Sequence, residues 1–174
     1  MPRSTANTYI FGYGSICDIT TLRTSEHITR PLKRTVIPAI LDNHKVVLNK
    51  RSYTGNNAYA NIMPCKDKCV YGIIVPLCRQ EVKRLDKREG TPIHYERVLV
   101  TVRTRRGEMD VYTYIARPDQ IALDGRNISH AYYNNLSRGL QFMQSLDRHG
   151  TFYRDPGYFQ QHEKYYYATK TALC

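Results

Sequence analysis

The segment Tyr9–Ser15, which reads Tyr-Ile-Phe-Gly-Tyr-Gly-Ser, constrains the fold of this chain more than any other. It begins with aromatic and β-branched residues, which favour a half-buried strand, and ends in a loop with two glycines and a serine. Gly12 and Gly14 accept backbone angles with φ > 0 that other residues avoid. Backbone N–H groups at such a strand end form a concave anion site. The segment therefore predicts a strand over residues 8–13 and a loop suited to a carboxylate or a developing oxyanion.

Two glycine motifs of nucleotide-binding proteins are incomplete in this segment. The dinucleotide-binding pattern needs a third glycine where this chain has Cys17. The P-loop needs a Gly-Lys-Ser or Gly-Lys-Thr sequence, which does not follow. An ordinary tight turn stays open as the alternative interpretation.

A second informative segment spans residues 81–90, which overlap an expected helix at about 79–89. Val82 and Leu85 are three residues apart, which suits one face of a short helix, and Gly90 is typical of the position just beyond a helix C-terminus. Glu89 then lies in the last turn, where the helix dipole disfavours a charged carboxylate. Such an environment suits a general base. The alternative is a solvated acidic residue among lysines and arginines.

Five short motifs occur in a fixed order between about residues 8 and 145. They are Tyr13-Gly14-Ser15, Val70-Tyr71-Gly72-Ile73-Ile74, the segment from Leu85 through Gly90, the segment from Tyr95 through Val100, and Ser129-His130-Ala131-Tyr132. In this order and rough spacing they resemble the γ-glutamylcyclotransferase superfamily, which includes AIG2-like and ChaC-like branches.

The resemblance implies a fold and a reaction. Several strands with short helices already suggest an α+β architecture, and the resemblance implies a small mixed β-barrel flanked by short helices. It also implies that a γ-glutamyl amine, dipeptide or glutathione is converted to 5-oxoproline and a free amine. No cofactor and no metal are implied. The alternatives are a non-catalytic small-ligand-binding protein of the same fold and, less favoured, a basic nucleic-acid-binding protein.

The resemblance assigns roles to individual residues. Glu89 is the implied general acid/base. Tyr132 is implied to bind the glutamyl portion, and Tyr95 and Tyr114 are weaker candidates for the pocket wall. We expect loops 50–57 and 117–128 to contact the leaving amine. The loop residues that we expect to bind the substrate are Tyr13, Gly14, Ser15 and Ile16.

Length and composition predict one domain over residues 1–174, with a tyrosine-rich C-terminal extension at 147–174. Five scattered cysteines argue against a disulfide framework. Cys65 and Cys69 resemble half of a zinc site, but no second pair lies nearby, so we expect no metal. Residues 1–7 are polar and no membrane span is present, which predicts a cytoplasmic protein.

The net charge of +11 favours acidic partners. Basic residues are spread along the chain, which is typical of a solvated surface and also suits a small anionic substrate. The tyrosines and basic residues of the tail are consistent with stacking on single-stranded nucleic acid. We expect instead that the tail packs over the barrel or forms a contact between subunits of a homo-oligomer.

Local patterns predict the remaining elements. These are a helix at 18–24 with Asp18 as N-cap, a hairpin over 32–48 turning at Asp42-Asn43, strands at 58–63 and 69–75, strands at 94–104 and 108–116, and a helix from the N-cap Ser129 to about Leu146.

Overall fold

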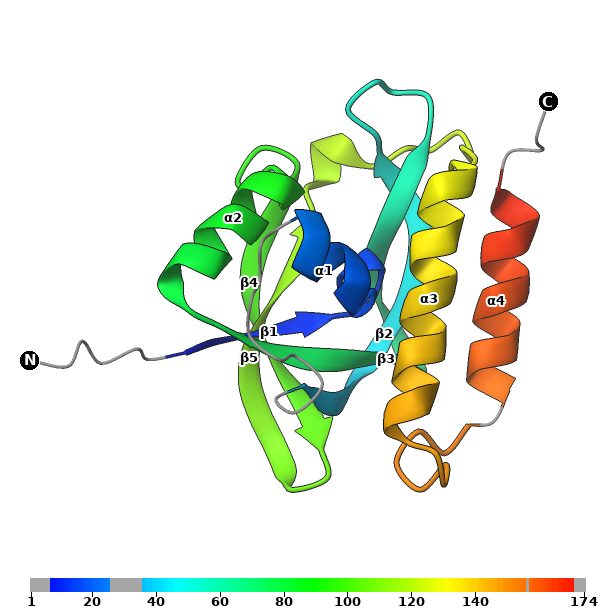
Figure 1. Cartoon of the computed structure of the whole chain (residues 1–174). Coiled ribbons are helices and arrows are strands. Elements are labelled where there is room, and N and C mark those ends of the chain that lie inside the picture. The colour runs from blue at the N-terminus through cyan, green and yellow to red at the C-terminus, as the bar shows by residue number, and fades with distance from the viewer. Residues whose placement is uncertain (1–6, 26–35, 156, 171–174) are drawn as a thin grey trace, which may run out of the picture.

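The computed structural model describes residues 7–25, 36–155 and 157–170 (Figure 1). Within these residues, strands form a closed barrel in the order β1-β3-β2-β4-β5. β1 closes the barrel by pairing antiparallel with β3 and parallel with β5. The mixed barrel with its flanking helices confirms the predicted α+β class. The strands are β1 (Thr8–Gly12), β2 (Ile37–Arg51), β3 (Ala58–Leu77), β4 (Tyr95–Thr104) and β5 (Gly107–Ala116).

β2 and β3 are longer than the sequence predicted. The expected hairpin over 32–48 is wrong, because β2 runs through Asp42 and Asn43 and pairs with β3 on both sides of them. The expected break in β3 at residues 64–68 is also wrong. The first part of that hairpin, residues 32–35, lies outside the described residues.

A bulge explains both errors. The register of β2 against β3 shifts after Asp42, and Asn43 and Asp67 have left-handed φ values of 56° and 61°. Asn and Asp tolerate this conformation better than most residues. Residues that are typical of turns therefore form a bulge in two paired strands here. The chain reverses direction only at the 52–57 loop.

Helices cover the outside of the barrel. In Figure 1, α3 and α4 lie side by side along one flank, and α2 lies on the other. The predicted caps are present: Asp18 Oδ1 accepts a hydrogen bond from Thr20 N at 3.2 Å, and Ser129 Oγ accepts one from Tyr132 N at 3.1 Å. Over the described ranges, no helix is long and apolar enough to cross a membrane. The helices are η1 (Ser15–Cys17), α1 (Ile19–Ser25), α2 (Arg79–Glu89), η3 (Pro118–Gln120), α3 (His130–Leu146) and α4 (Gly157–Thr169).

The tyrosine-rich tail packs on β3. The Tyr71 ring lies between the rings of Tyr153 and Tyr158, at centroid distances of 4.8 and 4.0 Å. The Tyr153 hydroxyl donates to Gly72 O at 2.5 Å, and the Tyr158 hydroxyl accepts from Tyr71 N at 3.0 Å. Tyr166 is also buried. These rings are part of the core and are not free to stack on bases, whereas Tyr165 and Tyr167 of the same tail are exposed.

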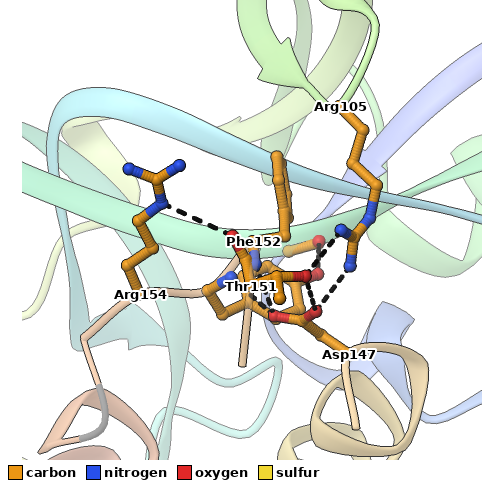
Figure 2. Close-up of polar contacts among 7 residues, drawn as sticks. Arg105, Asp147, Thr151, Phe152 and Arg154 are labelled. Atoms are coloured by element: carbon orange, nitrogen blue, oxygen red, sulfur yellow. Dashed lines mark hydrogen bonds and ion pairs between the residues drawn. The ribbon is translucent and has the colours of Figure 1, made fainter. Parts of the chain in front are cut away.

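Asp147 organises the loop between α3 and α4 (Figure 2). Its carboxylate accepts hydrogen bonds from Phe152 N at 2.9 Å, Tyr153 N at 2.7 Å and Arg105 Nη2 at 2.5 Å. Figure 2 shows Arg105 pointing toward Asp147, so the β4–β5 turn is tied to this loop. Burial acts to raise the pKa of the Asp147 carboxyl, but the hydrogen bonds outweigh burial and lower that pKa.

Candidate active site

Apart from Tyr114, the individual residues that the sequence singled out for the site line one recess. The recess shares Ser15, Glu89, Tyr95 and Tyr132 with an adjoining chamber of about 280 Å³. We call the recess and the chamber together the site cavity. The recess is lined by Tyr13, Gly14, Ser15, Ile16, Ala60, Glu89, Tyr95 and Tyr132, and the chamber adds Lys50, Tyr53, Tyr59 and Arg88.

The loop after β1 turns directly into η1 beside the recess. Cys17 N donates to Gly14 O at 3.0 Å, and Asp18 N donates to Ser15 O at 3.1 Å. The first backbone N–H that donates within this turn is that of Cys17. The N–H groups of Ser15 and Ile16 therefore have no acceptor within the turn, as is usual at a helix start. Such amides are suited to an anion.

Close packing, and not a left-handed backbone, explains the two glycines of this loop. Neither Gly12 nor Gly14 has a positive φ, so that expectation was wrong. A Cβ on Gly14 would lie 3.0 Å from Ala60 Cβ, and a Cβ on Gly12 would lie 2.5 Å from Ile16 Cγ2. The glycines therefore let β3 and η1 approach the loop closely.

Glu89 is the last residue of α2 and faces the cavity. The predicted helix end is confirmed, because Gly90 has φ of 66° and its N–H bonds to Asp86 O and Lys87 O. The Glu89 side chain is 14% exposed, and its Oε1 lies 3.8 Å from Arg88 Nε. Glu89 is therefore not a fully solvated acidic residue.

One turn earlier, Asp86 ties α2 to the barrel. Arg97 Nη1 donates to both Asp86 carboxylate oxygens, at 2.9 and 2.7 Å, and the Tyr114 hydroxyl donates to Asp86 Oδ1 at 2.7 Å. Tyr114 lies in neither part of the site cavity, so its suggested place in the pocket wall was wrong. It holds the helix that carries Glu89.

The charge of Glu89 acts on the tyrosines around it. Burial raises the pKa of Tyr13, Tyr95 and Tyr132, and the negative charge of Glu89 raises each further. These phenols therefore stay protonated at neutral pH and act as neutral polar groups in the cavity wall.

The hydroxyl groups of these tyrosines differ in what they bind. Tyr13 donates to Tyr114 O at 2.6 Å, and Tyr95 donates to Ala60 O at 2.7 Å, so both protons are committed to backbone carbonyls. The Tyr132 hydroxyl instead accepts from Ala60 N at 3.0 Å. Tyr132 is thus the member of this group best suited to donate to a bound molecule.

Sequence reasoning missed several chamber residues. Lys50 and Tyr53 belong to the 50–57 segment that was expected to contact the leaving amine, but neither was named. Arg88 precedes Glu89 in a run of charged residues, and its Nη2 donates to Ser15 Oγ at 3.1 Å. Nothing in a single sequence separates these residues from ordinary surface residues, since their partners are distant in the chain.

The cavity combines a largely buried carboxylate, loop amides at a turn start and two cationic side chains, Lys50 and Arg88. A carboxylate can exchange protons with a substrate amine. Amides and cations can hold a substrate carboxylate or the oxyanion of an acyl transfer. The arrangement therefore suits a small acidic amide.

The sequence profile of the family described as "Gamma-glutamyl cyclotransferase, AIG2-like" matches residues 10–135, which is more than half of the chain. No curated protein sequence matches significantly.

Solved structures share the fold. YkqA from Bacillus subtilis is 16% identical with a TM-score of 0.73; the match covers 98% of this chain but only 58% of YkqA. A gamma-glutamyl cyclotransferase is 18% identical with a TM-score of 0.61, over 81% of this chain and 86% of that protein. A gamma-glutamyl cyclotransferase specific to glutathione from yeast is 13% identical with a TM-score of 0.60, over 95% and 97% of the two chains.

Proposed function

This chain belongs to the gamma-glutamyl cyclotransferase, AIG2-like family, and we propose that it cyclises a γ-glutamyl compound to 5-oxoproline and releases a free amine. The substrate is a γ-glutamyl amine, dipeptide or glutathione. Its small size and its α-carboxylate suit a chamber of about 280 Å³ that is lined by cationic side chains and adjoins the loop after β1.

The reaction is intramolecular, so few protein groups are needed. The substrate's α-amine attacks its own γ-carbonyl carbon, a new C–N bond closes the ring, and the original amide C–N bond breaks. The protein gains rate by holding the substrate chain folded, since well-oriented intramolecular reactions reach very high effective molarities.

Glu89 is the proposed general acid/base. The substrate's α-ammonium loses two protons as it becomes the lactam N–H, and the leaving nitrogen gains two as it departs as an ammonium. A carboxylate that accepts a proton from one nitrogen and delivers it to the other connects these changes. The burial of Glu89 beside the loop amides supports this role.

The loop after β1 is proposed to hold negative charge. Ring closure places negative charge on the γ-carbonyl oxygen, and amide donors aimed at such an oxygen lower the barrier. The amides of Tyr13, Gly14, Ser15 and Ile16 serve this oxygen or the α-carboxylate. Tyr132 contributes its hydroxyl to the glutamyl portion, and Tyr95 forms the wall.

One observation carries the proposal: Glu89, the β1 loop and Tyr132 come from distant parts of the chain and line the same recess. A binding protein that kept the fold but lost catalysis needs the pocket but no buried base. The presence of the carboxylate therefore favours the enzyme.

The test is to incubate the purified protein with γ-glutamylalanine, glutathione, γ-glutamylethylamine and γ-glutamyl-ε-lysine, and to measure 5-oxoproline. The proposal predicts protein-dependent formation of 5-oxoproline from at least one compound. Binding without any turnover would support the non-catalytic alternative, and neither binding nor turnover would overturn both.

A further inference from the structure

Lys50, near the end of β2, is a lysine inside the site cavity. The residue is buried, and it is one of the residues that line the chamber together with Glu89 and Arg88. Lysine is almost never fully buried unless it is paired. Its position therefore needs an explanation that the proposed reaction does not supply.

The Lys50 ammonium contacts a backbone carbonyl and a histidine ring. Nζ donates to Arg51 O and lies 3.1 Å from His94 Nδ1. The same His94 Nδ1 lies 3.0 Å from Gln120 Oε1. This nitrogen can accept a hydrogen bond from Lys50 or donate one to Gln120, but it cannot do both at once. An ammonium has three N–H groups, so at least one remains for another acceptor.

No carboxylate among the described residues forms an ion pair with Lys50. Burial lowers the pKa of its ammonium, and the negative charge of Glu89 partly opposes this effect. A buried cation without a paired anion is costly. A bound molecule with a carboxylate would supply the missing partner.

Three tyrosine rings surround this ammonium. Nζ lies 5.0 Å from the ring centroid of Tyr53, 5.7 Å from that of Tyr59 and 5.6 Å from that of Tyr95. Ring faces attract a cation, but they carry no net charge. The same three rings line the chamber, so they hold Nζ at the chamber wall.

The two cations of the chamber are attached to different walls. Arg88 is next to the β1 loop, because its Nη2 donates to Ser15 Oγ at 3.1 Å. Lys50 lies at the end of β2, against His94 and the 52–57 loop. With Glu89 as the only carboxylate in the described lining, the chamber has an excess of positive charge. A γ-glutamyl amino acid has the complementary negative charge, whereas a γ-glutamyl monoamine is neutral overall.

We propose that Lys50 is a specificity-determining residue whose ammonium binds a carboxylate on the leaving amine, so that the preferred substrates are γ-glutamyl amino acids. This inference rests on the proposed function, because it concerns the second half of the same substrate. The γ-glutamyl end lies at Glu89, where the chamber meets the recess, and the leaving amino acid extends through the chamber with its carboxylate at Lys50.

Three compounds test this directly. They differ in the leaving amine. It has a charged carboxylate in γ-glutamylalanine, a neutral amide of the same size in γ-glutamylalaninamide, and neither group in γ-glutamylethylamine. Their kcat/KM values are compared for the wild-type protein, Lys50→Met and Lys50→Arg. For each compound, kcat/KM of the variant is divided by kcat/KM of the wild type. This ratio removes the differences in intrinsic reactivity between the leaving amines. Lys45→Met is the matched control, because Lys45 is an exposed lysine on the same strand.

The proposal predicts that Lys50→Met lowers kcat/KM for γ-glutamylalanine by about 10- to 100-fold, the usual value of a hydrogen bond to a charged group. The other two compounds should change little, Lys50→Arg should keep part of the preference, and Lys45→Met should match wild type. An equal loss for all three compounds overturns the proposal. Lys50→Gln replaces Lys50→Met if the latter does not fold.

A binding arm separates this inference from the proposed function. Calorimetry with the Glu89→Gln protein measures the affinities of the same compounds, with and without Lys50→Met. A preference for γ-glutamylalanine that disappears with Lys50→Met supports the role of Lys50, even if the wild-type protein forms no 5-oxoproline. Turnover of all three compounds with equal affinity overturns the role of Lys50 and leaves the enzyme intact.

Discussion

The contact between Tyr114 and Asp86 allows a quantitative prediction for the helix that carries Glu89. Tyr114→Phe removes the hydroxyl that donates to Asp86 Oδ1 at 2.7 Å, while Arg97 keeps its two contacts with Asp86. A hydrogen bond to a charged group contributes about 1.5–3 kcal/mol. For a domain of this size the loss corresponds to a fall in Tm of roughly 3–12 °C. Because α2 is held less firmly, 5-oxoproline formation should also fall.

Thermal unfolding followed by circular dichroism measures the first effect, and 5-oxoproline release measures the second. Tyr112→Phe is the matched control, since Tyr112 lies on the same strand and is 39% exposed. It should melt and react as the wild type does. An unchanged Tm for Tyr114→Phe would refute the anchoring of α2 through Asp86.

Three further predictions concern the stability of the fold. Gly72→Ala should lose at least about 1–3 kcal/mol of unfolding free energy, because its Cβ would lie 2.2 Å from Gly12 O; a wild-type denaturation midpoint would contradict this. Ser129→Ala should lose about 0.5–2 kcal/mol because Tyr132 N loses its cap; equal stability in urea would argue against the cap. The lowered pKa of Asp147 stabilises the fold above the unfolded-state pKa, and this contribution disappears as pH falls through the folded-state pKa. Asp147→Asn should therefore be less stable than wild type at pH 7, and the difference should shrink as the pH falls below the ordinary carboxyl pKa of 3.8; a difference independent of pH would contradict the sign.

Local signals in the sequence predicted the parts of the fold that depend on neighbouring residues. The caps at Asp18 and Ser129 and the end of α2 at Gly90 each depend on residues within one turn of the chain. The family resemblance also grouped Tyr13, Glu89, Tyr95 and Tyr132, which line one recess in the structure. These features need no knowledge of the tertiary structure.

Features that depend on distant contacts were not predictable in this way. Asn43 and Asp67 look like turn residues, and only the pairing of β2 with β3 makes their left-handed conformation a bulge. Tyr114 looked like a pocket residue until its contact with Asp86 was visible. Lys50 resembles any basic residue at a strand end, because the three rings around it come from separate segments.

Replacement of Glu89 by glutamine tests the central claim most directly, since the change keeps the shape of the side chain and removes its ability to exchange protons. General acid–base catalysis contributes about 10²- to 10⁴-fold, so Glu89→Gln should keep the wild-type Tm and lose at least about 100-fold in 5-oxoproline release. Glu96→Gln, a change in a half-exposed glutamate on β4, should retain full activity. Turnover of Glu89→Gln at the wild-type rate would contradict the account.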